Sequence, residues 1–323
     1  MKEDMRRLVC LAGAGGIRAA ARLMTMAQDS PERMAELLSA SRAWPEPRIV
    51  VGLTGPPGSG KSVLVDRLIA GLRKRRPERR IGVIAVDPSS PYSGGALLGD
   101  RVRMMKHAAD PMVFIRSAAT RGRLGGLMLG VVGTVRIMGL IGSDVVLIET
   151  VGVGQGEVEI AKLADLVTVI FPPEDGDSIQ LLKAGLMEIG DIFVINKADQ
   201  PGAGRRYAQL RAALTLGERR ADGDLPDVHL ISALEDKGVR ELIDQLDRRY
   251  ERDHAHWCVR RKAAIESEIR RAILEEFDRQ CAQAIGSEEV KRILNDETSV
   301  MELVKEISSK IAIGAYQSGG CCS

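Results

Sequence analysis

The segment from Gly55 to Ser62 carries the strongest chemical signal in this sequence. It reads Gly-Pro-Pro-Gly-Ser-Gly-Lys-Ser, a complete Walker A pattern, between an apolar run and a stretch with helical periodicity. Glycines at this spacing let backbone N–H groups surround phosphate oxygens, Lys61 neutralises the β- and γ-phosphates, and Ser62 reaches Mg²⁺. The residues predicted to contact the nucleotide here are Gly55, Pro56, Pro57, Gly58, Ser59, Gly60, Lys61, Ser62 and Val63.

A second motif, about 135 residues further on, predicts which base is bound. It consists of Asn196, Lys197, Ala198 and Asp199, and it directly follows an apolar run. The carboxylate of Asp199 can accept hydrogen bonds from guanine N1–H and the 2-amino group, whereas adenine would leave it unpaired. After the last apolar run come Ser232, Ala233 and Leu234, where a backbone N–H would meet guanine O6. The sequence therefore favours GTP and GDP over adenine nucleotides.

Carboxylates at the ends of two apolar runs are candidate metal ligands. Glu149 ends the run that begins at Val145, the Walker B position, and Asp87 ends an earlier run. Either can hold Mg²⁺ directly or through its waters, although both are also suited to capping a loop or helix. Gln155, in the glycine-rich stretch after Glu149, could orient water or be a plain exposed glutamine. We assign catalytic roles to Lys61, Glu149 and Gln155.

The elements that must position these residues form a parallel sheet. Seven apolar runs rich in β-branched residues lack polar alternation, which is typical of strands buried on both faces. They are Ile49–Thr54, Ile81–Val86, Met112–Ile115, Val145–Ile148, Leu166–Phe171, Ile192–Ile195 and Val228–Ile231. We predict an α/β fold, a mostly parallel P-loop sheet with helical extensions at both ends.

Three regions follow from this pattern. Residues 1–47 form an N-terminal helical region, residues 48–250 the nucleotide-binding domain, and residues 251–323 a C-terminal helical region. The C-terminal helices can form either an arm or a cap packed on the sheet, because helical periodicity does not say which surface a helix covers.

Composition limits the function classes. The 323 residues include 46 Lys and Arg and 44 Asp and Glu, which gives a net charge of +2. Aromatic residues make up 3% of the chain. These values argue against a nucleic-acid binder that relies on bulk charge or base stacking. The apolar stretch Leu124–Ile148 is interrupted by Arg136 and Asp144, so we expect no membrane span. The charged start and the five scattered cysteines favour a cytoplasmic protein without a signal peptide or a disulfide framework.

Four segments resemble one known family, the MeaB-type GTPases. These segments are Val86–Met104, Arg121–Leu127, Glu149–Gln155 and Lys183–Asp199. The family includes the methylmalonic aciduria type A protein, and its members were formerly described as ArgK or arginine/ornithine transport kinases. They are P-loop GTPases of the SIMIBI class, and the resemblance is dense over about residues 48–234.

The resemblance implies a function and several partners. It implies a chaperone of an adenosylcobalamin-dependent acyl-CoA mutase that gates cofactor loading and protects the mutase, with a cobalamin adenosyltransferase as a further partner. It also implies a homodimer formed by the C-terminal helices, and Gln155 in a switch that senses the mutase. The residues implied around Mg²⁺ are Ser62, Asp87, Asp100 and Glu149. The segments Pro172–Gln180 and Gln155–Glu159 depart from the pattern of many members, which leaves the particular mutase open.

Other functions remain alternatives at this point. A small-molecule or protein kinase needs an acceptor pocket and usually adenine, against which the Asn196–Asp199 motif argues. A nickel or zinc insertion GTPase carries Cys and His near its switches, but no cysteine lies between residues 11 and 257. A regulatory nucleotide-binding module needs no hydrolysis. We identify no arginine finger in the sequence, so we expect slow intrinsic turnover that a partner accelerates.

Overall fold

The computed structural model of the chain describes residues 3–29, 31–87, 105–107, 109–119, 131–150, 163–173, 186–216, 225–295 and 298–318. Contacts between residues divide the chain into two compact units, Met1–Ala264 and Ile265–Ser323.

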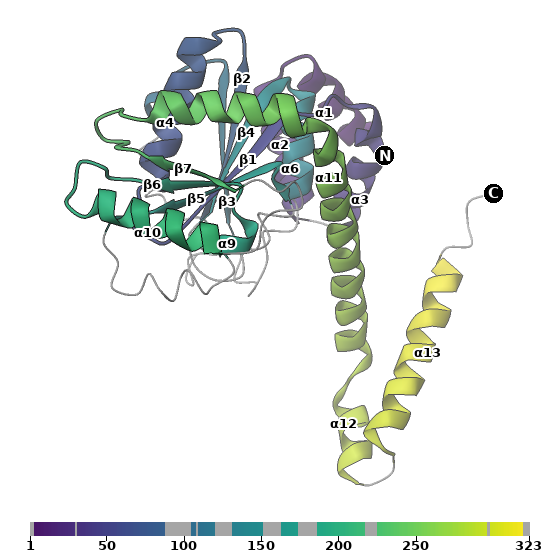
Figure 1. The fold of residues 1–323 in the computed structure, drawn as a ribbon. Helices are drawn as coiled ribbons and strands as arrows, with labels where there is room; N and C mark the ends of the chain where they lie inside the picture. The colour runs from purple at the N-terminus through teal and green to yellow at the C-terminus, as the bar shows by residue number, and fades with distance from the viewer. Residues whose placement is uncertain are drawn as a thin grey trace. The chain divides into compact units, whose positions relative to one another are not determined.

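A seven-stranded sheet organises the first unit (Figure 1). Its strands are β1 (Ile49–Thr54), β2 (Arg80–Asp87), β3 (Val113–Ala119), β4 (Ser143–Glu149), β5 (Leu166–Phe171), β6 (Ile192–Ile195) and β7 (Asp227–Leu230). Every neighbouring pair is parallel, in the order β3-β2-β4-β1-β5-β6-β7. The seven predicted runs are confirmed as strands, and β1 lies at the centre between β4 and β5.

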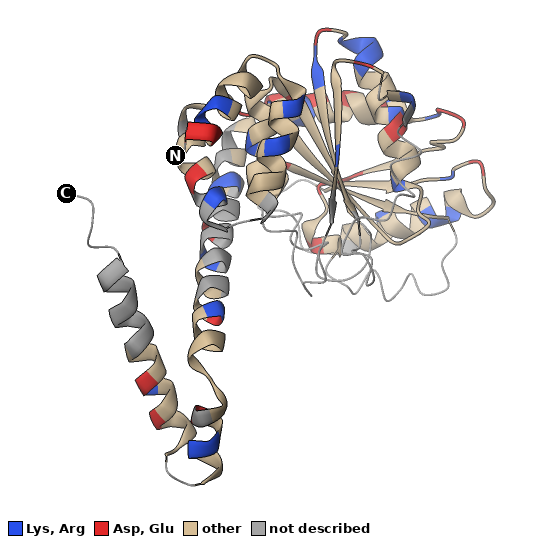
Figure 2. Cartoon of the chain, turned by 180° about the vertical axis from the view of Figure 1, so that it is seen from behind, with Lys and Arg blue, Asp and Glu red and all other residues tan. Residues whose placement is uncertain are grey.

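Apolar side chains fill both faces of the sheet. In β1, Val50 packs into one hydrophobic core, whereas Val51 and Leu53 pack into the other. The distribution of charged residues agrees with this burial (Figure 2). Strands other than β3 carry Lys, Arg, Asp or Glu only near their ends. Burial on both faces favours a parallel sheet covered by helices, so the predicted α/β class is confirmed.

Helices from different parts of the chain cover the two faces. One face is covered by α4 (Lys61–Arg75) and by the first part of α11 (Val239–Ala284), which buries Leu242, Leu246 and Trp257. The helices on the other face are α1 (Glu3–Gly13), α2 (Ile17–Asp29), α3 (Pro31–Ala40), α6 (Val131–Leu140) and α10 (Ala203–Leu216). Short helical turns are η1 (Ser41–Ala43), η2 (Met105–His107) and α9 (Leu186–Ile189). The first part of α11 is therefore a cap on the sheet.

The second unit contains the end of α11 together with α12 (Ser287–Leu294) and α13 (Val300–Ser318). Arg292 of α12 pairs with Glu306 of α13 at 3.2 Å, and Leu303 and Ile307 of α13 are buried. No helix among the described residues combines the length and apolar character that crossing a membrane requires.

Two buried aspartates satisfy backbone groups at the N-terminal edge of the sheet. Asp165 accepts a hydrogen bond from the Val50 N–H at 2.7 Å, and Asp191 accepts one from the Val167 N–H at 2.8 Å. Both aspartates face arginines of α11. Arg261 contacts Asp165 at 2.6 Å, and Arg249 lies 3.8 Å from Asp191. Burial raises the pKa of Asp165, so its ionised form depends on the guanidinium beside it.

We predict that Arg261→Met lowers the free energy of unfolding by about 3 kcal/mol, because it leaves the buried carboxylate of Asp165 without a cation. Urea unfolding measures this loss. Arg252→Met, at an exposed position of the same helix, should change stability by less than about 0.5 kcal/mol.

The cost of Arg261→Met should depend on pH. The pKa of Asp165 is raised in the folded protein, and removing Arg261 removes hydrogen bonds that lower it. The folded variant therefore binds a proton more readily than the unfolded chain, and its stability falls as the pH rises through the folded pKa. The destabilisation should shrink as the pH is lowered from neutral through the raised pKa of Asp165. A cost that does not vary with pH would contradict the role given to Asp165.

Candidate guanine nucleotide site

The loop between β1 and α4 has a backbone that only glycine fits at two positions. Gly55 has φ +142°, and a Cβ there would lie 2.0 Å from the carbonyl oxygen of Ile170. Gly60 has φ +89°, and a Cβ there would lie 2.3 Å from the side-chain nitrogen of Asn196. The loop therefore packs closely against the ends of two other strands, as the predicted phosphate loop requires.

Lys61 is buried at the start of α4. Its ammonium group donates hydrogen bonds to the carbonyl oxygens of Gly55 at 2.8 Å and Pro56 at 3.0 Å. These bonds keep the positive charge within the loop. The first N–H groups of α4 have no carbonyl partner within the helix, so they add donors and the positive end of the helix dipole. Together these groups can bind an anion such as a nucleotide phosphate.

Two oxygen ligands lie next to this loop. The Ser62 hydroxyl donates a hydrogen bond to Glu149 Oε1 at 2.5 Å, and both side chains are buried. The strand register explains this proximity, because Glu149 at the end of β4 pairs with Leu53 of β1. Hydroxyl and carboxylate oxygens are ligands that suit Mg²⁺. Asp87 ends β2, but its side chain is outside the described residues, as are Asp100 and Gln155.

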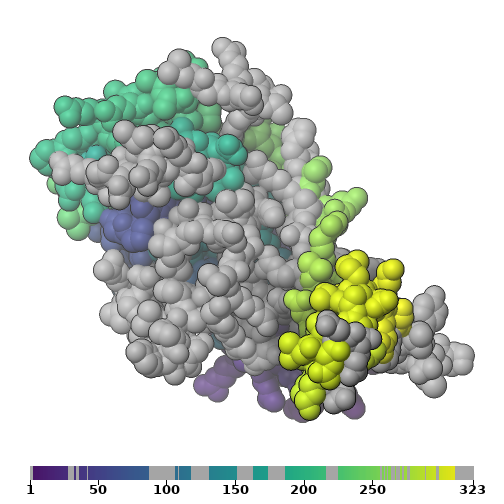
Figure 3. Space-filling model, turned by 90° about the horizontal axis from the view of Figure 1, so that it is seen from below, coloured from purple at the N-terminus to yellow at the C-terminus, as the bar shows by residue number. Residues whose placement is uncertain are grey.

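Asn196 connects three loops at the same edge of the sheet. Its side-chain NH₂ group donates a hydrogen bond to the Ser59 carbonyl at 2.9 Å, and its Oδ1 accepts one from the Ala233 N–H at 3.1 Å. Its own backbone N–H donates to the Phe171 carbonyl at 2.9 Å. Figure 3, a view from below Figure 1, shows blue atoms from an early part of the chain next to teal and green atoms from later parts. The loops predicted for phosphate and base therefore adjoin.

Asp199 presents an exposed carboxylate at this edge. The Ser232 hydroxyl donates a hydrogen bond to it at 2.5 Å and holds the pKa of Asp199 below its ordinary value. Lys197 has φ +58°, and the Ala198 N–H donates to the Ile231 carbonyl at 3.0 Å, which fixes the turn that carries Asp199. An ionised carboxylate in this place can accept the hydrogen bonds of guanine N1–H and the 2-amino group.

One residue near these loops has no signal in the sequence. Arg67, in the second turn of α4, donates hydrogen bonds to the carbonyl oxygens of Ala233 and Leu234. An arginine in an amphipathic helix is usual, and only the position of α4 beside the loop after β7 distinguishes this one.

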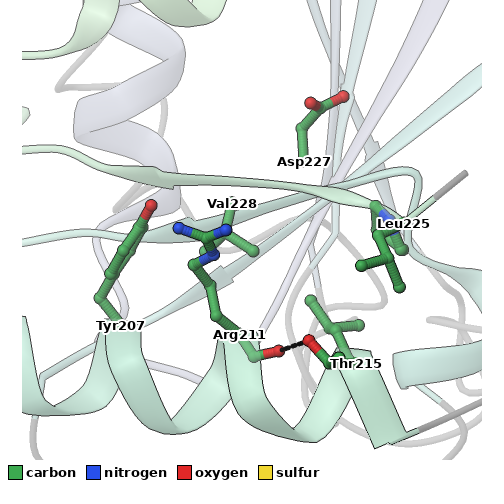
Figure 4. Close-up of a pocket in the computed structure, with 8 residues that line it drawn as sticks. Tyr207, Arg211, Thr215, Leu225, Asp227 and Val228 are labelled. Atoms are coloured by element: carbon green, nitrogen blue, oxygen red, sulfur yellow. Dashed lines mark hydrogen bonds between the residues drawn. The ribbon is translucent and has the colours of Figure 1, made fainter.

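A pocket of about 340 Å³ lies elsewhere, between α10 and β7 (Figure 4). Tyr207, Arg211 and Thr215 line it from α10, and Leu225, Asp227 and Val228 from the chain around β7. It contains none of the residues that the sequence predicts for the nucleotide.

The fold and this edge of the sheet define a P-loop GTPase. A Walker A loop follows the central strand, the carboxylate that ends the neighbouring strand β4 contacts Ser62 of that loop, and the Asn-Lys-Ala-Asp loop adjoins it through Asn196. The family of methylmalonyl-CoA mutase-associated GTPases called MeaB matches residues 20–286. The chain belongs to this family and hydrolyses GTP.

Individual relatives agree with this assignment. A protein of Pyrococcus abyssi named as a GTPase is 42% identical over 298 residues, which cover 92% of this chain and 89% of the relative. The Escherichia coli GTPase ArgK is 36% identical over 250 residues, covering 75% and 73% of the two chains. The mouse mitochondrial methylmalonic aciduria type A homolog is 40% identical over 199 residues, covering 61% of this chain and 48% of its own.

A solved structure shares the fold. The crystal structure of an LAO/AO transport system kinase aligns with a TM-score of 0.66 at 24% identity, covering 97% of this chain and 99% of the other. This likeness supports the α/β architecture described above.

We predict that Asp199→Asn weakens GTP binding and shifts the preference toward XTP. The amide can donate a hydrogen bond to the xanthine 2-oxygen, whereas the carboxylate can only accept. Titration of both nucleotides into wild type and variant measures the ratio of dissociation constants. The assignment of Asp199 to the base is wrong if the variant keeps the wild-type ratio.

Proposed function

We propose that this chain is a Mg²⁺-dependent GTPase that acts as a chaperone of an adenosylcobalamin-dependent acyl-CoA mutase. The observation that carries the proposal is the match to the MeaB family over residues 20–286, a family named for its association with methylmalonyl-CoA mutase. The mouse relative, named for methylmalonic aciduria type A, supports the same class of partner. The chaperone role is to gate cofactor loading and to protect the mutase.

Hydrolysis of GTP is attack of water on the γ-phosphate. The charge that develops on the phosphate oxygens is stabilised by Lys61 and by the backbone N–H groups of the phosphate loop. The ammonium group is already held in the loop by the carbonyls of Gly55 and Pro56, so little rearrangement is needed to meet a phosphate. Asn196 and Asp199 are proposed to orient the nucleotide through its base.

The donor set beside the loop fits Mg²⁺. Ser62 and Glu149 bring two hard oxygen ligands together at 2.5 Å, next to the predicted phosphate position. We propose that these two residues, with Asp87 and Asp100, hold the ion directly or through water. When bound, Mg²⁺ supplies positive charge to the β- and γ-phosphate oxygens.

Coupling to the mutase is assigned to the loop that contains Gln155. Glycines at positions 152, 154 and 156 lower the cost of two alternative backbone arrangements. Among the described residues we identify no arginine finger, and a partner that orders this loop would supply the missing acceleration. A cobalamin adenosyltransferase is proposed as a further partner in the delivery of the cofactor.

We predict that Gln155→Ala reduces mutase-stimulated GTP turnover by about 10²-fold, with a far smaller effect on intrinsic turnover and on GTP affinity. The measurement is phosphate release with and without adenosylcobalamin-dependent acyl-CoA mutases. The control is Gln209→Ala, at an exposed position of α10. Equal stimulation of wild type and Gln155→Ala would remove the loop from the mechanism. Absence of stimulation by any such mutase would favour a regulatory module instead.

We further propose that the protein is a homodimer held through its C-terminal helices. Unit Ile265–Ser323 exposes large apolar side chains, a property typical of association surfaces. Among the side chains of this unit that the structure describes, the most exposed large apolar ones are Leu294, Met301, Ile273, Val300, Leu274 and Val304.

Light scattering should give the mass of a dimer at micromolar concentration. Met301→Glu should shift the protein toward the monomer, because a charge would have to be desolvated in the interface. Lys305→Gln, an exposed position of the same helix, should leave the mass unchanged. A wild-type protein that is monomeric under these conditions would disprove the proposal.

A further inference from the structure

We propose that Arg67 is a positioning residue that directs the backbone N–H of Leu234 at guanine O6. This assignment rests on the guanine nucleotide site proposed above, where the sequence already places a backbone N–H of Ser232, Ala233 or Leu234 at O6, and adds the side chain that orients that donor.

The guanidinium of Arg67 contacts two consecutive carbonyl oxygens. Its Nε donates to the Ala233 carbonyl at 2.9 Å, and its Nη2 donates to the Leu234 carbonyl at 3.3 Å. A guanidinium is planar and presents several donors in a fixed arrangement, so it can restrain two neighbouring peptide groups at once. Arg67 therefore restrains the orientation of the loop that follows β7.

The orientation of the Ala233 carbonyl sets the direction of the Leu234 N–H, because the two groups belong to the same peptide unit. In a trans peptide, the C=O and N–H groups point in opposite directions, and the described residues contain no cis peptide. Because the Ala233 carbonyl points toward Arg67, the Leu234 N–H points away from it. The donor thus faces away from α4 and is available to a ligand.

The neighbouring N–H groups already have partners. The Ala233 N–H donates to Asn196 Oδ1 at 3.1 Å, and the Glu235 N–H donates to the Ser232 hydroxyl oxygen at 3.3 Å. Within the part of the chain that the structure describes, the Leu234 N–H donates to no protein group. Of three consecutive donors, it is the one left for a base.

The position of this donor fits the edge of guanine. The Ser232 hydroxyl that accepts from the Glu235 N–H also donates to the Asp199 carboxylate at 2.5 Å. The peptide unit that follows Leu234 is therefore hydrogen-bonded, through Ser232, to the carboxylate proposed for N1–H and the 2-amino group, and the Leu234 N–H belongs to the same short loop. Guanine O6 is adjacent to N1, so one base can reach both groups. Adenine carries an amino group in place of O6 and would set donor against donor.

The test compares GTP with 6-thio-GTP, which keeps N1–H and the 2-amino group but carries sulfur, a weaker acceptor, in place of O6. Wild type should bind GTP more tightly than 6-thio-GTP by about fivefold, the contribution of one hydrogen bond. In Arg67→Ala, GTP affinity should fall by about fivefold while 6-thio-GTP affinity barely changes, so the preference disappears. Arg67→Lys keeps the positive charge but not the paired donors, so it should lose most of the preference for GTP over 6-thio-GTP. This variant replaces Arg67→Ala in the test if the alanine variant does not fold.

The matched control is Arg73→Ala, on the same helix. Arg73 pairs with Asp110 at 2.8 Å and contacts the Arg79 carbonyl, so its loss should lower stability without altering the ratio of the two affinities. An unchanged ratio in both Arg67 variants would overturn the assignment of Arg67. Equal affinity of the wild type for GTP and ATP would instead overturn the guanine site itself, so the two failures are distinguishable.

Discussion

Seven parallel strands bring all their C-terminal ends to one edge of the sheet, and the site depends on this constraint. The loops after β1, β6 and β7 must meet there, although they are far apart in the chain. Asn196 joins them, because its amide group donates to the phosphate loop and accepts from the loop after β7. Its side chain is buried, so both ends of the amide must be satisfied, and the spacing of the loops is fixed by that requirement.

At the opposite edge of the sheet, where the strands begin, backbone N–H groups must find hydrogen-bond acceptors. Asp165 and Asp191 supply these acceptors from buried positions. Buried carboxylates need cations, which α11 provides as Arg261 and Arg249. Helix α11 begins just after the loop that follows β7, at the nucleotide edge of the sheet. Its arginines therefore also stabilise the opposite edge, where β1 and β5 begin.

Helix α4 also has two roles, one at the phosphate loop and one at the loop after β7. Lys61 and Ser62 at its start face the phosphate loop and the end of β4, and one and a half turns later Arg67 restrains the loop after β7. Phosphate and base recognition are thus connected through one rigid helix as well as through Asn196. A displacement of either loop would strain hydrogen bonds in the other, which favours a site that is preorganised for one class of nucleotide.

The sequence by itself determined the local parts of this protein. Apolar runs without alternation predict buried strands, and the Walker A and Asn-Lys-Ala-Asp patterns depend on residues that are adjacent in the chain. Only the tertiary structure decided which side chains meet: Asn196 and Ser59 are 137 positions apart, Arg67 and Ala233 166, and Ser62 and Glu149 87. These contacts depend on strand order, which places β4 and β5 on either side of β1. Periodicity and composition do not contain that order, because it arises from packing the helices on both faces and from satisfying the buried polar groups at the two edges.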